Sequence, residues 1–517
     1  MRKLTKILIM TFLLVIALSS VGSLTSQAAS KGKYFLSGEL YYHTISKNKI
    51  EVCGTTRNEG TLTIPSSVYY KGKKYTVTQI ADHEIYYQDK PVTQETTNGY
   101  DVDINMPGWR YYCYNRIDGK EMPMDVNWIS GSRIKKVILP STLTYIGEGA
   151  FCGCEKLKSV VFANSYKKLI VGKNVFGGTA LESLRFPNGT YELKDCAAGT
   201  VAEIYIPASV KKIGAGVVNH KTKKVTIDKK NKKFKMKNGI LYSYNEKILI
   251  GASSEVPKRV KISEKTTKII KQAFAGTKVT NVTLNNKIKT IPAGLFYDCK
   301  KLTRVNNTNG VTKIGYGAFA FCKNLKSIGR LPKVKRIGRA AFWDDIRLNI
   351  HISATVTDID EYAFVGSVGS APMTVTVDEN NTIYSIEEGF LIKATETEKI
   401  VIMQLSIEEK KLIIPEGITS VPVKIGGYHC KEIVFPATLK KQNGVACVNN
   451  GKIIYNASTV PEFGKDFGLS NLGKDVLTVV VPKGTLKAYK KAINSVAQDE
   501  DGVDFFIDGF NEIKEQE

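Results

Sequence analysis

A phenylalanine recurs at nearly constant spacing through the middle of this 517-residue chain. Phe274, Phe296, Phe319, Phe342 and Phe364 are separated by 22, 23, 23 and 22 residues. Each follows an isoleucine at a fixed distance, and an alanine directly precedes four of the five. One unit of this length cannot bury its apolar side alone, so neighbouring units must stack and share a core. The period therefore predicts a strand-rich repeat solenoid of units of about 22–23 residues.

Other positions keep the same phase. The phrase YIGEGAF at 145–151 anticipates KIGYGAF at 313–319, and three units carry Cys three residues and Leu six residues after the Phe. Short β-branched runs that end at a proline mark one strand per unit: TLTIPSSV (61–68), KVILPSTL (136–143), EIYIPASV (203–210), KLIIPEGI (411–418) and EIVFPATL (432–439). Proline ends the pairing of the strand, and a coiled or short-helical return follows. We expect Phe, Leu and Cys to form buried columns with one member per turn, about 4.8 Å apart.

One longer block is duplicated. Residues 225–242 align without a gap on residues 375–392, at an offset of 150. In each copy a strand leads to an Asn-containing turn, an aromatic residue, and a Gly before another apolar run. This turn chemistry predicts two hairpin inserts, near 225–250 and 375–402.

These phrases resemble the BspA-like leucine-rich repeats of bacterial secreted and cell-surface proteins. The resemblance rests on the IG-x-x-AF-x-x-C-x-x-L pattern, the insert FKMKNGILYS and the ending TVVVPKGTLKAYKKA (478–492), and it covers roughly residues 60–85 and 131–490. It weakens at 185–220, where GAGVVNH replaces the expected AF pair and a distorted repeat is expected. The family implies a right-handed leucine-rich solenoid and, in characterised members, adhesion or binding of host proteins at the cell surface.

The N-terminus has the three-part layout of a secretory signal peptide: basic residues, the apolar run at 7–18, and small residues up to Ala28. Residues 1–28 are therefore predicted to be removed and the protein to be secreted, without a transmembrane anchor. We divide the rest into an N-terminal cap and first repeat (29–130) with an insert at 86–130, the solenoid (131–470), and a C-terminal cap (471–517). In that last part, residues 485–497 fit a short amphipathic helix that seals the final repeat.

The insert at 86–130 is rich in aromatic residues. Two interpretations stay open: the rings cap the exposed end of the first repeat, or they form a binding surface, where Tyr and Trp are enriched. The candidate ligand-binding residues are Tyr100, Trp109, Tyr111, Tyr112, Tyr114 and Trp128.

A second candidate site is basic. The chain has a formal net charge of +25, and residues 211–237 hold eleven Lys against one acid, Asp228. A turn-borne basic strip attracts polyanions through counterion release, whereas a merely solvated Lys-rich face has no ligand. The duplicate at 379–387 lacks this charge, which indicates a role particular to the first copy. The candidate polyanion-binding residues are Lys229, Lys230, Lys232, Lys233, Lys235 and Lys237.

No cofactor or metal is expected. The nine Cys do not show zinc-like spacing, and we predict buried thiols, although Cys299 and Cys322 lie one turn apart and a disulfide stays open. The five His share no repeat phase, and hydrolase, metalloprotease and nucleotide-binding motifs are absent. We therefore expect no enzyme but an extracellular binding protein that resembles a surface adhesin. The partner would be a host protein, a glycan or an anionic cell-wall polymer. The alternatives are a structural protein held at the wall by its basic surface and, more weakly, a secreted accessory to an enzyme.

Overall fold

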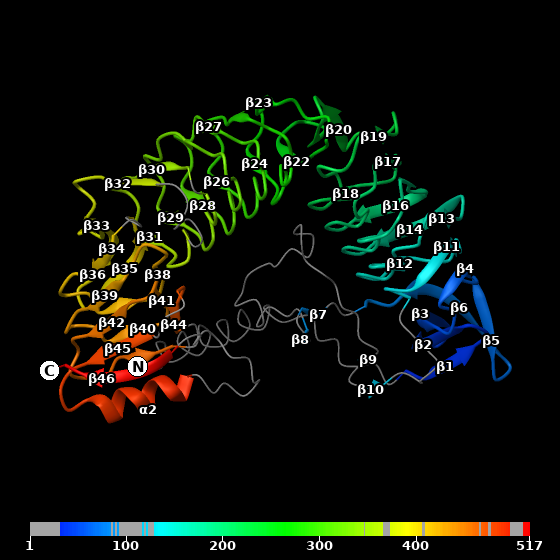
Figure 1. Cartoon of the computed structure of the whole chain (residues 1–517). Coiled ribbons are helices and arrows are strands. Elements are labelled where there is room, and N and C mark those ends of the chain that lie inside the picture. The colour runs from blue at the N-terminus through cyan, green and yellow to red at the C-terminus, as the bar shows by residue number, and fades with distance from the viewer. Residues whose placement is uncertain are drawn as a thin grey trace, which may run out of the picture. The chain divides into compact units, whose positions relative to one another are not determined.

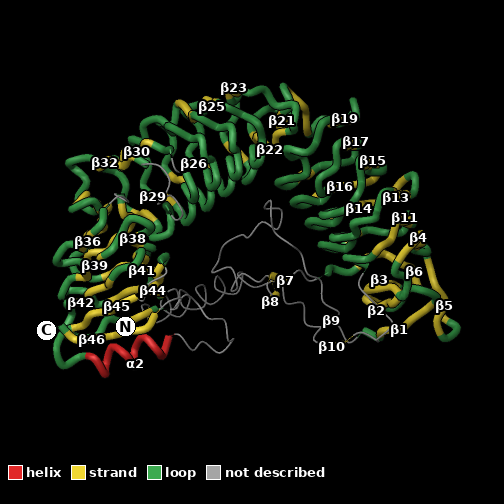
Figure 2. The backbone as a smooth tube through the Cα atoms, in the orientation of Figure 1, coloured by secondary structure: helices red, strands yellow, loops and turns green. Residues whose placement is uncertain are grey.

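The chain is a strand-rich solenoid of about 16 turns spaced by about 23 residues, with little helix (Figures 1 and 2). The structure, a computed structural model, describes residues 32–83, 129–345, 347–364, 373–405, 409–464, 467–473, 477–496 and 510–516, and four two-residue strands between 86 and 121. It confirms the predicted strand-rich repeat solenoid with hairpin inserts. The predicted signal peptide (1–28) lies outside the described residues. Two compact units are present: residues 32–182 with 186–193, and residues 183–185 with those from 194 onward.

The first unit begins with an antiparallel meander and continues as two parallel sheets. The longer sheet runs β1 (Tyr34–Ser37), β2 (Leu40–Ser46), β3 (Lys49–Thr55), β6 (Lys73–Ile80), β12 (Tyr145–Ile146), β14 (Ser165–Val171) and β16 (Asn188–Leu193), with β5 (Ser67–Tyr70) paired to β6. The second sheet runs β4 (Glu59–Thr63), β11 (Arg133–Leu139) and β13 (Ser159–Phe162). Two isolated pairs are β7 (Tyr86–Tyr87) with β8 (Lys90–Pro91), and β9 (Arg116–Ile117) with β10 (Lys120–Glu121).

In the second unit each turn contributes one strand that ends just before a proline, or before the residue that stands at the same place in the turn. These strands pair in parallel and form three sheets. The first is β15 (Ser183–Arg185), β17 (Glu203–Ile206) and β19 (Lys224–Ile227); the second is β23 (Arg259–Lys261), β25 (Asn281–Thr283) and β27 (Arg304–Asn306), continued through Ser327 to β30 (Asn349–Ile352) and β32 (Thr374–Val377); the third is β36 (Lys411–Ile413), β39 (Glu432–Phe435), β42 (Lys452–Tyr455), β45 (Leu477–Val481) and β46 (Phe510–Glu515).

Each turn also contributes a two-residue strand that carries the conserved Ile position. In Figure 1 these strands follow one another along the second unit. They are β18 (Lys212–Ile213), β24 (Lys268–Ile269), β26 (Thr290–Ile291), β28 (Lys313–Ile314), β29 (Arg336–Ile337), β31 (Asp358–Ile359), β37 (Ser420–Val421), β40 (Lys441–Gln442) and β43 (Glu462–Phe463). Near the C-terminal end a third row appears: β38 (Ile425–Gly426), β41 (Val445–Val448) and β44 (Gly468–Asn471).

The two duplicated segments form antiparallel meanders that join the solenoid at their last strand. The first consists of β20 (Phe234–Lys237), β21 (Ile240–Ser243) and β22 (Ile248–Ala252), with β22 parallel to β24. The second consists of β33 (Tyr384–Glu387), β34 (Phe390–Ala394) and β35 (Lys399–Gln404), with β35 parallel to β37. The predicted hairpin inserts are therefore correct.

The return after the short strand is a coil of tight turns, not a helix. Its backbone is paired with the next turn: the amide of Phe296 donates to Ala318 O at 2.8 Å, and that of Phe319 donates to Ala341 O at 2.9 Å. The residue two positions before the Phe and the residue two positions after it both adopt a positive φ, as at Gly317 (53°) and Phe321 (63°). This conformation points their backbone amides toward the next turn. This conformation favours glycine, which explains part of the chain's glycine use.

The glycine that follows the recurring Ile is required for a different reason. A Cβ on Gly315 would lie 2.7 Å from the backbone nitrogen of Ala293 in the preceding turn. Gly315 is therefore required by the close approach of the neighbouring backbone, and its φ is not in the left-handed range.

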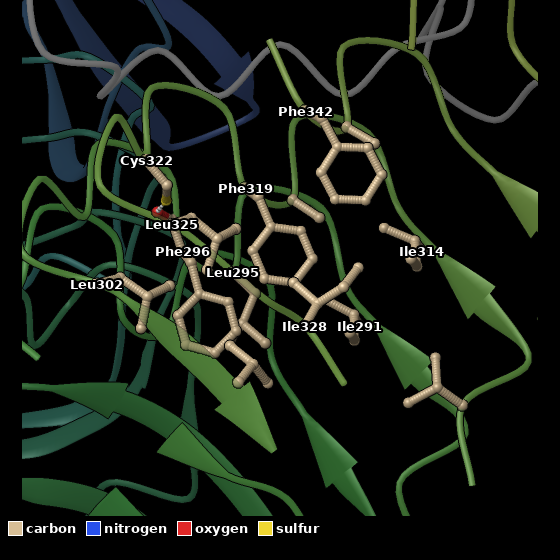
Figure 3. Close-up of a cluster of buried hydrophobic side chains, with 14 of the residues drawn as sticks. Ile291, Leu295, Phe296, Leu302, Ile314, Phe319, Cys322, Leu325, Ile328 and Phe342 are labelled. Atoms are coloured by element: carbon tan, nitrogen blue, oxygen red, sulfur yellow. Dashed lines mark hydrogen bonds between the residues drawn. The ribbon is translucent and has the colours of Figure 1, made fainter. Parts of the chain in front are cut away.

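The phenylalanines form a continuous buried column (Figure 3). The rings of Phe274, Phe296, Phe319, Phe342 and Phe364 stack with centroid separations of 5.6, 5.4, 5.4 and 5.5 Å, and each ring is at most 2% exposed. In the segment GAGVVNH, where a distorted repeat was expected, the turn keeps its form: Val218 lies five residues after Ile213, is 2% exposed, and follows a positive-φ Gly216. A smaller residue fills the same place.

Each end is closed by a different element. At the N-terminal end the antiparallel strands β1–β3 bring a stacked set of rings, in which Phe35 lies 4.0 Å from Tyr70 between centroids. At the C-terminal end α2 (Leu486–Val496) buries Tyr489 and Ile493, and the Tyr489 hydroxyl donates to Ala457 O at 2.7 Å. The amphipathic helix predicted at 485–497 is present.

A column of small polar side chains lies beside the Phe column, three residues after each Phe. The thiols of Cys299 and Cys322 donate to the carbonyls of Phe274 and Phe296, one turn back, at 3.0 and 2.9 Å. In the next turn this position is Asp345, whose carboxyl is fully buried, and neither of its oxygens has a hydrogen-bond partner in the described chain. Burial raises the pKa of Asp345 well above its ordinary value. A carboxyl without a hydrogen-bond partner among the described residues therefore stands where the neighbouring turns have a thiol donor.

Truncation of one ring in the Phe column should be strongly destabilising. We expect Phe319→Ala to lower the free energy of unfolding by about 3–5 kcal/mol, because it removes buried surface and leaves a cavity between two stacked rings. Urea titration measures this. Tyr428→Ala, at a side chain that is 73% exposed, is the control and should change stability by less than about 0.5 kcal/mol.

Asp345 should make the protein less stable as pH rises. Above about pH 4 the unfolded state releases the Asp345 proton while the folded state keeps it, so the free energy of unfolding falls, by at most about 1.4 kcal/mol per pH unit, until the pH reaches the raised folded-state pKa. We expect Asp345→Asn, and Asp345→Cys as in the neighbouring turns, to be more stable than the wild type at pH 7 but not at pH 4. Urea titrations at the two pH values measure this, and an equal difference at both would contradict a neutral buried carboxyl.

Candidate functional site

The structure describes the residues of only one of the two predicted sites. All six aromatic candidates, Tyr100, Trp109, Tyr111, Tyr112, Tyr114 and Trp128, lie outside the described residues. The six lysines of the basic strip lie on the turn before β20 and on β20 itself. The lysine-rich insert is therefore the candidate site that the geometry describes.

The turn of this insert is anchored by a buried asparagine. The Asn231 side-chain amide donates to Pro207 O and Val210 O of the preceding turn, at 2.9 and 3.3 Å. Its side-chain oxygen accepts from the amide of Lys233 at 2.8 Å. Asn381 makes the equivalent bonds in the second insert, to Ser353 O at 2.9 Å and Val356 O at 3.1 Å. The Asn shared by the duplicated blocks therefore fixes the insert to the solenoid, and it leaves the lysines beside it outside.

Two of the six lysines are neutralised by one carboxylate. The ammonium groups of Lys235 and Lys237 lie 2.8 and 3.1 Å from the carboxylate of Glu246, whose side chain is 8% exposed. Lys235, the hydroxyl of Ser263 and Lys237 all stabilise the charged form and lower the pKa of Glu246 to about 2. These two lysines therefore contribute to the scaffold.

The ion pairs of Glu246 change the interpretation of the charge difference between the two inserts. Glu387 stands at the position equivalent to Lys237, and it pairs with Lys399 at 3.2 Å. An ion pair is present in both inserts, with its sign reversed, so the loss of positive charge in the second copy does not by itself mark a functional role. The sequence could not show this, because Glu246 lies in the turn between β21 and β22, beyond the basic strip.

The other four lysines remain exposed cations. Lys229, Lys230, Lys232 and Lys233 are all exposed, and within the part of the chain that the structure describes they form no ion pair. The Lys232 ammonium lies 6.0 Å from the ring centroid of Tyr244, which is 49% exposed. The insert thus presents a group of four exposed lysines without an ion pair beside an exposed ring, and the only acid next to them in sequence is Asp228, whose carboxylate accepts from the backbone amide of Lys230 at 2.8 Å.

The remaining sequence candidates have structural places. The eight cysteines within the described ranges are all buried, and Cys299, Cys322, Cys430 and Cys447 are free thiols. Over the same ranges no three His, Cys, Asp or Glu side chains gather in a way that could hold a metal ion. No described helix is long and apolar enough to cross a membrane.

Comparison with known proteins places the repeats in a family. A family model described as the BspA type leucine-rich repeat region matches residues 127–244 and 254–370, with six copies. None of the curated proteins matches the chain.

Several solved structures are similar to this chain at low identity. A leucine-rich cell surface protein from Faecalibacterium prausnitzii is 20% identical over 67% of this chain and 95% of its own, with a TM-score of 0.42. A leucine-rich repeat protein from Eubacterium ventriosum is 19% identical over 67% and 98%, with a TM-score of 0.43. The pneumococcal vaccine antigen PcpA is 15% identical over 94% and 99%, with a TM-score of 0.35. At these values the assignment rests on the family model and the repeat geometry.

Replacement of Glu246 should separate its structural effect from its electrostatic effect. We expect Glu246→Gln to lower the free energy of unfolding by about 1–2 kcal/mol, because charge-assisted hydrogen bonds to two lysines and Ser263 are lost. The same change releases Lys235 and Lys237 and should tighten binding of a polyanion such as inorganic polyphosphate. Urea titration and binding at low salt measure the two effects, and weaker binding would contradict this account of the insert.

Proposed function

Because the repeats of this chain are of the BspA type of leucine-rich repeat, we propose that it is a non-catalytic extracellular binding protein that holds anionic macromolecules at the cell surface. The repeats supply the scaffold, and the insert carries the binding residues. The signal-like N-terminus and the repeat family support an extracellular location. The excess of basic residues supports an anionic partner, either a host glycan or an anionic cell-wall polymer.

The observation that carries the proposal is the group of four exposed lysines on the first insert. Lys229, Lys230, Lys232 and Lys233 have no carboxylate partner within the described residues, although carboxylates pair with lysines elsewhere on the surface. Each lysine that neutralises an anionic group releases condensed counterions from a charged polymer, so binding is strongest at low salt. Asn231 holds the turn in place, which reduces the ordering that a ligand must impose.

A second candidate function is recognition of a specific host protein through the aromatic insert at 86–130. Its support is compositional: two of the chain's three Trp are within this segment. A patch of this kind gains affinity from apolar contact and keeps it at high salt. Salt dependence therefore separates the two functions.

Neutralisation of the insert should weaken polyanion binding. We expect the quadruple variant Lys229→Gln, Lys230→Gln, Lys232→Gln and Lys233→Gln to lower the affinity for polyphosphate at least about tenfold at about 0.1 M salt. It should also reduce the slope of log K against log salt by about 3, because up to four phosphate contacts are lost. Fluorescence titration over a range of NaCl concentrations measures both quantities.

The matched control removes the same number of charges from paired lysines. Lys224, Lys411, Lys441 and Lys452 each lie within 4 Å of a glutamate, at 3.8, 2.9, 3.1 and 3.1 Å. Their joint replacement by Gln should leave the salt slope almost unchanged. Equal losses in the two variants would mean that only net charge matters, and the insert would not be the site.

A further inference from the structure

One exposed lysine without an acidic partner occurs in each of five consecutive turns of the second unit. They lie just before or within the short strands, from the start of β22 to the start of β29. None of them forms an ion pair within the described residues, and all are exposed. We call this set the lysine ladder: Lys247, Lys268, Lys289, Lys313 and Lys335.

The ladder alternates between two columns. Lys268 and Lys313 are the first residues of β24 and β28, whereas Lys247, Lys289 and Lys335 directly precede β22, β26 and β29. Threonine fills the intervening places: Thr267, Thr312 and Thr357 donate through their side chains to the carbonyls of Lys247, Lys289 and Lys335 at 3.4, 3.0 and 3.4 Å. Consecutive turns are about 4.8 Å apart, so the ladder presents one positive charge per about 4.8 Å over about 19 Å.

Some other exposed columns on this unit contain ion pairs. Glu432 on β39 lies between Lys411 on β36 and Lys452 on β42, at 2.9 and 3.1 Å. Arg336, which pairs in register with Lys313, is itself 3.1 Å from Asp358. Like charges on neighbouring strands are destabilising, and alternation of Lys with Thr reduces this cost without removing the charges. The ladder lysines therefore keep their charge, whereas the lysines of these ion-paired columns are neutralised.

We propose that the lysine ladder binds an extended phosphate polymer that lies along the axis of these turns, with about one phosphate group per turn. The row is two adjacent residues wide, with one lysine of the set in each turn, and that narrow shape is complementary to a linear polymer with repeated single charges. A globular acidic protein does not offer its carboxylates in such a line. Lysine, a compact point charge on a flexible stem, can follow phosphates along a chain without the fixed planar pairing of arginine.

The ladder is continuous with the lysine-rich insert. Strands β20, β21, β22 and β24 are neighbours in that order, so the first ladder residues lie on the strands that carry the insert (Figure 1). This inference rests on the proposed function, since both require an anionic partner. It goes further because it assigns a second set of binding residues, the orientation of the bound polymer and the chemical class of that polymer.

The test compares three quadruple variants of the full mature chain with inorganic polyphosphate as the probe. The ladder variant is Lys268→Gln, Lys289→Gln, Lys313→Gln and Lys335→Gln; the other two are the insert variant and the paired-lysine control described above. All replaced side chains of the ladder are exposed, so thermal unfolding should be unchanged. We expect the ladder variant to lose at least about tenfold in affinity at about 0.1 M salt, and about 3 in the slope of log K against log salt.

Each of the other outcomes would contradict a specific part of the proposals. If the ladder variant binds like the control while the insert variant loses affinity, the ladder is overturned and the proposed function stands. If the wild type does not bind polyphosphate even at low salt, the proposed function and the ladder both fail. If the ladder variant loses affinity for heparin but not for polyphosphate, the assignment to a phosphate polymer is wrong.

Discussion

The turns of this solenoid depend on one another through their backbone. In each return segment the amide of the Phe, and those two residues before and after it, point along the solenoid and donate to the next turn; for the turn of Phe319 the acceptors are Arg339, Ala341 and Trp343. A buried amide without an acceptor costs about as much as a lost hydrogen bond, so a single turn has no stable form. The left-handed residues, the glycines and the closed ends all follow from this requirement. At the last turn, α2 and β46 replace the missing neighbour.

The same dependence explains which parts of the fold could be predicted from the sequence. A residue that stacks on its own equivalent in every turn leaves a periodic signal, and Phe296, Phe319 and Phe342 were recognised in this way. The hairpin inserts were recognised because the duplicated block keeps its turn residues. The reason for Gly315 could not be predicted, since the atom that excludes a side chain belongs to another turn. Asp345 was overlooked because it interrupts the Cys pattern instead of repeating it.

The candidate site was predicted only in part. The basic strip was visible as composition, but the pairing of Lys235 and Lys237 with Glu246 requires the course of the meander, which no local count of charges contains. The lysine ladder was even harder to predict from the sequence. Its members are spaced by 21, 21, 24 and 22 residues among 74 Lys and Arg, and they alternate between two columns. Only the positions of the short strands show that these lysines fall on adjacent residues of successive turns, with threonines at intervening places.

The anchoring of the two inserts has a consequence for how such a chain changes over evolutionary time. Asn231 and Asn381 each reach back to the preceding turn, and the last strand of each insert pairs with the following short strand, so an insert is attached only through its two neighbouring turns. Each insert also supplies residues to the buried core, such as Ile240 and Tyr242 in the first, so a block of this kind is copied or lost together with its own part of the core. The two copies kept the asparagine, whereas Glu387 stands in place of Lys237 and pairs with a residue at a different position, so attachment and surface charge differ separately between the copies. New binding surfaces can therefore arise on this scaffold while the repeat itself stays unaltered.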